Sequence, residues 1–252
     1  MILTGDWHAD KLTAGFPRYK DVEQAVEETL VDAINPQEKA TLYVFLGDLA
    51  NPENPTAWPA VGLAANAQAV LSQNGVASIW ITGNHDVLED GSGESTLTPL
   101  HGVCRGSGKW AESAQYARSF VCRQPVFIGH SQLGTEFDVV CLPYVAKSHT
   151  YDPAAFVRSL PPTAGEDDRT VLVVGHLEIE GIVPGIESKE MARGRSMLWP
   201  VDAIRQRFGD QAILVGGHYH QRQYYGGVYF AGSIEALAFG DNAKPGYLVF
   251  AV

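Results

Sequence analysis

Cysteine is scarce in this sequence, and long apolar runs are missing. The three cysteines, Cys104, Cys122 and Cys141, are odd in number and fit no zinc-binding spacing, which argues against a disulfide scaffold or a zinc module. No apolar stretch approaches the ~20 residues that a membrane-spanning helix needs, and no basic segment followed by an apolar one opens the chain. We therefore expect a cytoplasmic protein with reduced thiols and no membrane partner.

Positive charge is also in short supply. Lys and Arg together number 18 against 29 Asp and Glu, which gives a formal net charge of −11. An acidic chain gains no long-range attraction to a polyanion, so the charge counts weakly against a nucleic-acid substrate. Divalent cations bound in a site would reverse the sign locally, so a nucleic-acid substrate stays open.

Apolar residues are plentiful by contrast. They make up 45% of the 252 residues and charged residues 19%, which is enough to bury a full core. In the first half, apolar runs at 2–4, 42–46 and 77–81 alternate with helical patterns at 20–35 and 59–74. Because these runs are apolar on both faces, they predict a parallel sheet covered by helices.

The second half of the chain is richer in strands. One clear helix is expected at 200–208, and the segment 87–119 is expected to be a long surface excursion beside the site. The strands should form a second, mixed sheet packed against the first. They are Pro125–Ile128, Val139–Leu142, Val171–Val174, Ile213–Val215, Val228–Phe230 and Tyr247–Phe250.

Polar side chains that can bind metals follow five of these strands. The carboxyl ends of parallel strands share one edge of a sheet, so we expect the groups to converge there. Their carboxylate, amide and imidazole donors suit Mn, Fe or Zn better than calcium. The fragments are Asp6-Trp7-His8, Gly47-Asp48, Gly83-Asn84-His85-Asp86, Gly175-His176 and Gly216-Gly217-His218-Tyr219-His220.

Each fragment alone is a common strand end, but all five in this order are not expected by chance. One ambiguity remains in the residues themselves. Gly129-His130 also follows an apolar run, so either His130 or His176 could supply the single histidine between the third and fifth fragments. His101 and His149 lie in polar segments and are interpreted as surface residues.

The set of fragments resembles the signature of the calcineurin-like metallophosphoesterases. The resemblance implies an α/β fold, a four-layer α-β-β-α sandwich of two mixed sheets flanked by helices. It also implies two divalent metal ions, most simply Mn, with Fe or Zn as alternatives. Asp48 would bridge them. Asp6, His8 and His220 would complete one site, and Asn84, His176 and His218 the other.

Two further residues take roles from the same resemblance. His85 follows a ligand without being one, and is expected to donate a proton or hydrogen bond to the leaving group. Asp86 is expected to orient His85. Leu142-Pro143-Tyr144 precedes His176 but follows His130, and in chains similar to SbcD such a segment precedes the ligand histidine, which favours His176.

Smaller features resemble SbcD-type DNA repair nucleases. They are Asp6-Trp7-His8, Leu142-Pro143-Tyr144, Gly217–Gln223, Gly232–Asp241 and Lys244–Tyr247. This resemblance implies a Mn-dependent DNA exo- or endonuclease in repair or recombination, with DNA and an SMC-like ATPase of the SbcC type as partners. The alternatives are a small-molecule phosphodiesterase or phosphatase, and a metal-stabilised scaffold without enzymatic activity.

Two features depart from that resemblance. SbcD-type proteins continue into a capping domain, whereas this chain ends at Val252, so we expect one nuclease domain over 1–252 without a capping domain, as a catalytic fragment or a compact relative. Asn51 stands where some relatives carry a histidine or carboxylate. The same resemblance makes the helices expected at 20–35 and 59–74 candidates for a homodimer contact, although both, and the first above all, could simply cover the sheet.

Overall fold

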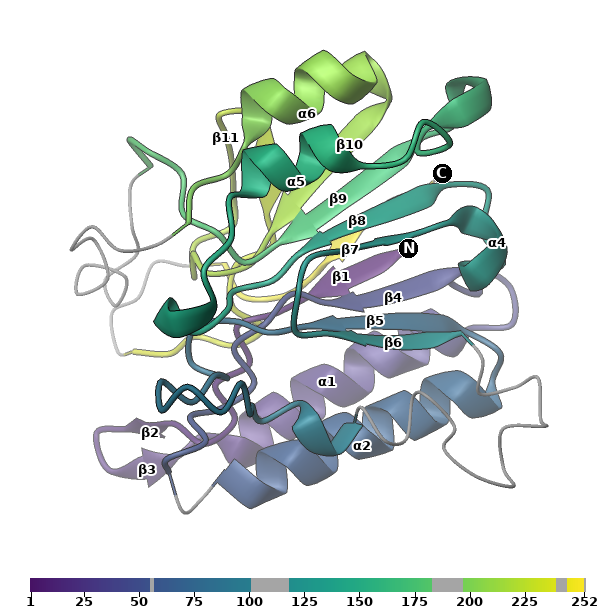
Figure 1. Ribbon diagram of the computed structural model, residues 1–252. Coiled ribbons are helices and arrows are strands. Elements are labelled where there is room, and N and C mark those ends of the chain that lie inside the picture. Colours follow the sequence, from purple (N-terminus) through teal and green to yellow (C-terminus); the bar gives the residue numbers. More distant parts are fainter. Residues whose placement is uncertain (55–56, 101–117, 183–196, 239–243, 252) are drawn as a thin grey trace.

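Two β-sheets lie face to face between two pairs of helices in the computed structural model (Figure 1). The structure describes residues 1–54, 57–100, 118–182, 197–238 and 244–251. In the first sheet the strand order is β13-β1-β4-β5-β6, and in the second it is β11-β12-β10-β9-β8-β7. The expected four-layer sandwich with two mixed sheets is therefore confirmed.

The first sheet is parallel except at one edge. Its strands are β1 (Ile2–Thr4), β4 (Leu42–Phe45), β5 (Ala77–Ile81), β6 (Ser119–Cys122) and β13 (Leu248–Val249). Only β13 runs antiparallel, beside β1. The sequence analysis placed Tyr247–Phe250 in the second sheet. That was wrong, because a two-residue strand at the end of the chain carries no pattern that selects its neighbour.

The second sheet has a parallel centre and antiparallel edges. Its strands are β7 (Val126–Ile128), β8 (Asp138–Leu142), β9 (Val171–Gly175), β10 (Ala212–Gly216), β11 (Gln223–Tyr225) and β12 (Val228–Phe230). The antiparallel pairs are β7 with β8 and β11 with β12. A separate hairpin of β2 (Leu12–Thr13) and β3 (Phe16–Pro17), which the sequence analysis did not predict, follows β1.

Helices cover the outer faces of both sheets. α1 (Tyr19–Ile34) and α2 (Ala57–Gln73) pack on the first sheet, and α5 (Pro153–Ser159) and α6 (Val201–Phe208) on the second (Figure 1). α4 (His130–Leu133) is a single turn. α5 is only two turns long and was not predicted from the sequence. No helix in the described ranges is long and apolar enough to cross a membrane.

The strands divide their side chains between separate cores. In β4, Tyr43 and Phe45 pack under α1 and α2, whereas Leu42 and Val44 pack between the two sheets. The side chains of β9 alternate in the same way, and Val173 packs on the outer face of its sheet, under α5 and α6. This is the period of two that a strand buried on both faces must have, and it explains why the sequence shows apolar runs rather than alternation.

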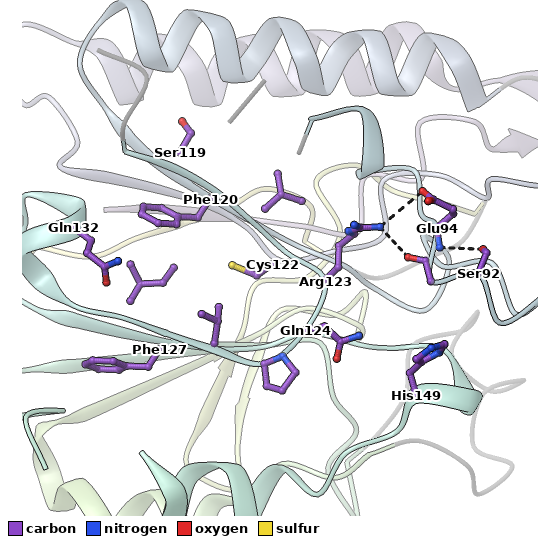
Figure 2. Close-up of a pocket in the computed structure, with 15 residues that line it drawn as sticks. Ser92, Glu94, Ser119, Phe120, Cys122, Arg123, Gln124, Phe127, Gln132 and His149 are labelled. Atoms are coloured by element: carbon purple, nitrogen blue, oxygen red, sulfur yellow. Dashed lines mark hydrogen bonds and ion pairs between the residues drawn. The ribbon is translucent and has the colours of Figure 1, made fainter. Parts of the chain in front are cut away.

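A cavity lies at one edge of the sandwich. β6 and β7 are edge strands of the two sheets, and between them lies a cavity of about 910 Å³ lined by Phe120, Cys122 and Phe127 (Figure 2). The expected surface excursion at 87–119 falls mostly on residues 101–117, outside the described residues, and its last residue begins β6.

Candidate metal centre

Four buried side chains meet at the carboxyl-terminal ends of the central strands. Asp6, His8, Asp48 and His220 each offer one ligand atom, and these atoms all lie within 4.8 Å of one another. Asp6 and His8 follow β1, Asp48 follows β4, and His220 follows β10. The structure thus brings together, from both sheets, the four residues expected to hold one ion.

The distances within this group are short. His8 Nε2 lies 3.1 Å from His220 Nε2 and 3.6 Å from Asp48 Oδ2, and His220 Nε2 lies 3.9 Å from Asp6 Oδ1. Two imidazole nitrogens facing each other and two carboxylates form a convergent donor set. A single cation between them would satisfy all four.

A second group shares Asp48 from its other side. Asp48 Oδ1 lies 3.5 Å from His176 Nε2, and Asn84 Oδ1 lies 3.0 Å from that nitrogen and 2.9 Å from His218 Nδ1. His176 Nδ1 donates to the Leu46 carbonyl at 2.7 Å, which directs Nε2 toward the group. Asp48 therefore directs one oxygen to each group, as a bridging ligand requires.

The bridging carboxylate provides a test of whether ions fit here. Asp48 is fully buried, and within the described ranges its Oδ2 accepts no hydrogen bond. A buried carboxylate oxygen is normally satisfied, because leaving it without a partner costs about 1–3 kcal/mol or more. An ion held between Asp48 and the neighbouring imidazoles would satisfy it. The residues present therefore fit a pair of divalent metals.

The backbone is bent to bring these groups together. Asp6, His8, Asp48 and His218 have φ angles of 49°, 41°, 62° and 84°, in the left-handed region that L-residues rarely occupy. Such conformations cost of order 1–3 kcal/mol each and collect at functional sites. Four among the candidate ligands indicate that the loops are shaped for the centre rather than for stability.

Glycines allow the loops to approach one another. A β-carbon on Gly83 would lie 2.2 Å from Asp48 Oδ1 and 2.5 Å from the Asp48 nitrogen. Gly47 has a φ of +98°, and a β-carbon there would lie 2.6 Å from His176 Nδ1. The glycines next to the ligands are therefore required by the contact between loops.

Burial sets the charge of three histidines. It lowers the pKa of His8 well below its usual value, lowers that of His218, and lowers that of His220 to about 4. At neutral pH these rings are neutral, which is the form that binds a metal.

Asp48 and His176 form a charged pair in the centre. Burial would raise the pKa of Asp48, but His176 and the neighbouring histidines keep it well below its usual value. Burial alone would lower the pKa of His176, but Asp48 and Asp6 raise it to about 9. Burial also raises the pKa of Asp6 well above its usual value. The carboxylates attract a positive charge, and a metal ion would take the place of the proton on His176.

His85 lies at the edge of the centre rather than within it. Its ring centroid is 5.0 Å from that of His8, its backbone nitrogen donates to Asp48 Oδ1 at 2.9 Å, and its side chain is half-buried. The ring lines a groove of about 330 Å³ beside the centre. His85 is thus placed to reach a group bound in that groove.

Asp86 does not orient His85. Within the described ranges its carboxylate accepts hydrogen bonds from the amides of Asp48, Leu49 and Gly83, each at 2.8 Å, and from the Thr96 hydroxyl at 2.6 Å. The expectation fails because the strand end turns after Asn84. The turn directs Asp86 under the Asp48 loop, where it fixes the backbone of a ligand.

His130 lies at the end of the second sheet that is opposite to the metal centre. β7 runs antiparallel to β8, so its carboxyl end comes beside the start of β8. There the His130 amide donates to Asp138 Oδ1 at 2.8 Å, and its ring lies 3.2 Å from the same oxygen. His176, which faces Asp48, is therefore the histidine that the centre takes from between the third and fifth fragments. His149 is exposed and lines the cavity between β6 and β7 (Figure 2).

Sequence reasoning missed several residues around the centre. Glu178 Oε1 lies 3.8 Å from His218 Nε2, and Thr96 binds Asp86. Lys11 and Asn54 line the groove with His85. Glu178 and Lys11 stand two and three residues after a ligand, a spacing that could have marked them. Thr96 comes from a segment without any such signal.

Comparisons with known proteins agree with this geometry. The family model described as calcineurin-like phosphoesterase matches residues 1–222, a range that includes every candidate ligand. No curated protein sequence matches the chain. The fold is similar to that of a dimetal phosphatase from Danio rerio, with a TM-score of 0.52 and 11% identity over 91% of this chain and 85% of that chain. At that identity the likeness concerns the fold.

Proposed function

The chain belongs to the calcineurin-like phosphoesterase family, and we propose that it is a two-metal hydrolase of phosphodiesters. The observation that carries the proposal is the convergence of two donor groups on the two oxygens of Asp48. Two divalent ions in such a site supply Lewis-acid polarisation of phosphoryl oxygens and acidify water. Mn is the proposed metal, with Fe and Zn as alternatives for this donor set.

The residues of the centre have different proposed roles in hydrolysis. Asp6, His8 and His220 would hold one ion and Asn84, His176 and His218 the other, while Asp48 would contribute to both. His85 donates a proton or hydrogen bond to the departing oxygen of a substrate bound in the adjoining groove. Asp86 keeps the Asp48 backbone in place.

DNA is the proposed substrate class, on the resemblance to SbcD-type nucleases. Three of the segments that carry this resemblance have described residues that adjoin the centre. Trp7 stands between the ligands Asp6 and His8 in the sequence and is fully buried, and the Ser233 amide donates to the His220 carbonyl at 3.0 Å. Tyr144 donates its amide to Thr82, next to the Asn84 loop, at 2.9 Å. An SMC-like ATPase and a second copy of the chain are the proposed protein partners.

A small phosphodiester or phosphomonoester is the second candidate. The groove beside the centre, about 330 Å³, is near the lower limit for small-ligand sites, and the net charge of −11 repels a long polyanion. A single nucleotide or a comparable phosphoester suits those dimensions.

A substrate panel separates these candidates. Protein loaded with Mn is incubated with linear duplex DNA, single-stranded DNA, a cyclic nucleotide and a phosphomonoester, with Asp48→Asn as the control for contaminating activity. DNA cleavage by wild type alone supports the nuclease. Turnover of the small esters without DNA cleavage supports the second candidate. If the protein binds two metals but hydrolyses none of these substrates, it is a scaffold and the proposed function is wrong.

A further inference from the structure

Two of the three cysteines lie where the chain passes from the first sheet to the second. Cys122 is the last residue of β6, and only residues 123–125 separate it from β7. Val126, the first residue of β7, is paired in register with Cys141 of β8. Cys122 and Cys141 therefore belong to different sheets, and the short crossing between β6 and β7 brings their strands close together.

The side chains of these two cysteines meet inside the sandwich. Both are buried in the same apolar core between the sheets, and both are free thiols. The Cys122 and Cys141 thiols are hydrogen-bonded to each other. Since the two sulfurs are already in contact, only a small movement of the side chains is needed to bring them to the ~2 Å of an S–S bond.

The cavity of about 910 Å³ between β6 and β7 gives access to this pair. Cys122 lines the cavity together with Phe120 and Phe127 (Figure 2). Hydrogen peroxide is little larger than a water molecule, whose share of the liquid is about 30 Å³, so the cavity admits it. Cys141 is not among the described residues that line the cavity, so an oxidant that enters it meets Cys122 first.

We propose that Cys122 and Cys141 are a site of reversible oxidation, at which a hydroperoxide joins the two sheets by a disulfide. The Cys122 sulfur attacks one peroxide oxygen, the O–O bond breaks, and the departing hydroxide takes the thiol proton as the first water. The Cys141 sulfur then attacks the sulfur of the Cys122 sulfenic acid, the S–O bond breaks, and a second water leaves. The two thiols lose two electrons in all, and the peroxide gains them.

The order of these steps follows from the surroundings of the two thiols. Burial raises the pKa of Cys141 well above its usual value, and the neighbouring Cys122 thiol raises it further, so Cys141 stays protonated until Cys122 has been oxidised. The thiolate is the reactive form, so we expect the disulfide to form over minutes to hours. None of the candidate metal ligands is among the described residues that line the cavity, so the reaction is independent of the proposed function.

Peptide mapping without a reducing agent tests the proposal. Protein is treated with hydrogen peroxide in the presence of a chelator, digested, and analysed by mass spectrometry. The peptides that contain Cys122 and Cys141 should appear joined, with a mass lower by two hydrogens than the sum of the separate peptides, and dithiothreitol should separate them. Cys104→Ser, the matched control, should retain the link, and Cys122→Ala should lose it. In Cys141→Ala, Cys122 should stop at the sulfenic acid, which a 1,3-diketone probe labels.

Thermal denaturation shows whether the link fits the folded sandwich. A disulfide that closes a loop of about 20 residues should raise Tm by about 5–10 °C in the oxidised wild type, and the rise should vanish in Cys122→Ala. An oxidised wild type in which both cysteines remain thiols overturns the proposal, as does a link from either of them to Cys104 or to a second molecule. A linked protein that melts below the reduced one, or an unlabelled Cys122 in Cys141→Ala, also overturns it.

Discussion

Asp86 accepts the amide hydrogen of Asp48 at 2.8 Å, so one buried acid fixes the backbone of another. The same carboxylate accepts from Leu49, Gly83 and Thr96, which joins the end of β4 to the end of β5. Burial and the charge of Asp48 raise the pKa of Asp86 to about 6, so it is ionised at neutral pH. The backbone of the bridging ligand Asp48 is therefore held by a charged hydrogen-bond acceptor.

Asp86→Asn should destabilise the protein and weaken the metal centre. An asparagine keeps the size of the side chain but turns an NH₂ group toward backbone N–H donors, so at least one buried donor loses its acceptor. We expect the free energy of unfolding of the metal-free protein to fall by about 1–3 kcal/mol, measured by urea denaturation. Metal affinity should fall with it.

The control for this change is Asp90→Asn. Asp90 is exposed and accepts from the Ser92 amide at 2.8 Å within its own loop, so its substitution should change stability by less than about 0.5 kcal/mol. An Asp86→Asn protein as stable as the Asp90→Asn protein would show that the four hydrogen bonds do not hold the loop.

Gly83→Ala should displace Asp48. The added β-carbon would lie 2.2 Å from Asp48 Oδ1, 2.5 Å from the Asp48 nitrogen and 2.7 Å from His176 Cε1, so there is no room for it. We expect stability to fall by about 1–3 kcal/mol and metal binding to be lost, checked by thermal denaturation and metal analysis. Gly62→Ala in the exposed face of α2, where nothing lies within 4 Å, should instead stabilise by up to about 1 kcal/mol. Retention of both metals in Gly83→Ala would refute this account.

The sequence predicted the elements that are long or buried on both faces. α1 and β4 follow from their apolar periodicity, and the position of Asp48 follows from the rule that parallel strands end at one edge. The short β13 was assigned to the wrong sheet because two residues do not specify a partner. Strand direction, which the pattern does not encode, decides between His176 and His130.

Contacts between loops could not be predicted from the sequence. Asp86 was expected to serve its neighbour His85, but its hydrogen bonds go to a loop 37 and 38 residues earlier in the chain. Lys11 and Asn54 likewise meet at one groove although no motif joins them. Such contacts depend on how loops pack, and only the folded chain places them.

Asp48→Asn should abolish the stabilisation that metal gives. In wild type, Mn at 100 times its dissociation constant should raise the free energy of unfolding by about 2.7 kcal/mol. An amide is a weaker ligand than a carboxylate and cannot bridge two cations, so the shift in Tm with Mn should vanish in Asp48→Asn. Thermal scans with and without Mn measure it. The same shift in both proteins would mean that Mn binds elsewhere.

His85→Ala should reduce catalysis without emptying the metal centre. The ring of His85 lines the groove and is not among the ligand atoms that converge on Asp6, His8, Asp48 and His220. Loss of a proton donor to the leaving group should lower kcat about 10²–10⁴-fold, with metal content and KM near those of wild type. His149→Ala, in an exposed segment away from the groove, is the matched control and should leave kcat unchanged. If His85→Ala loses its metals instead, His85 supports the centre and the leaving group departs without its help.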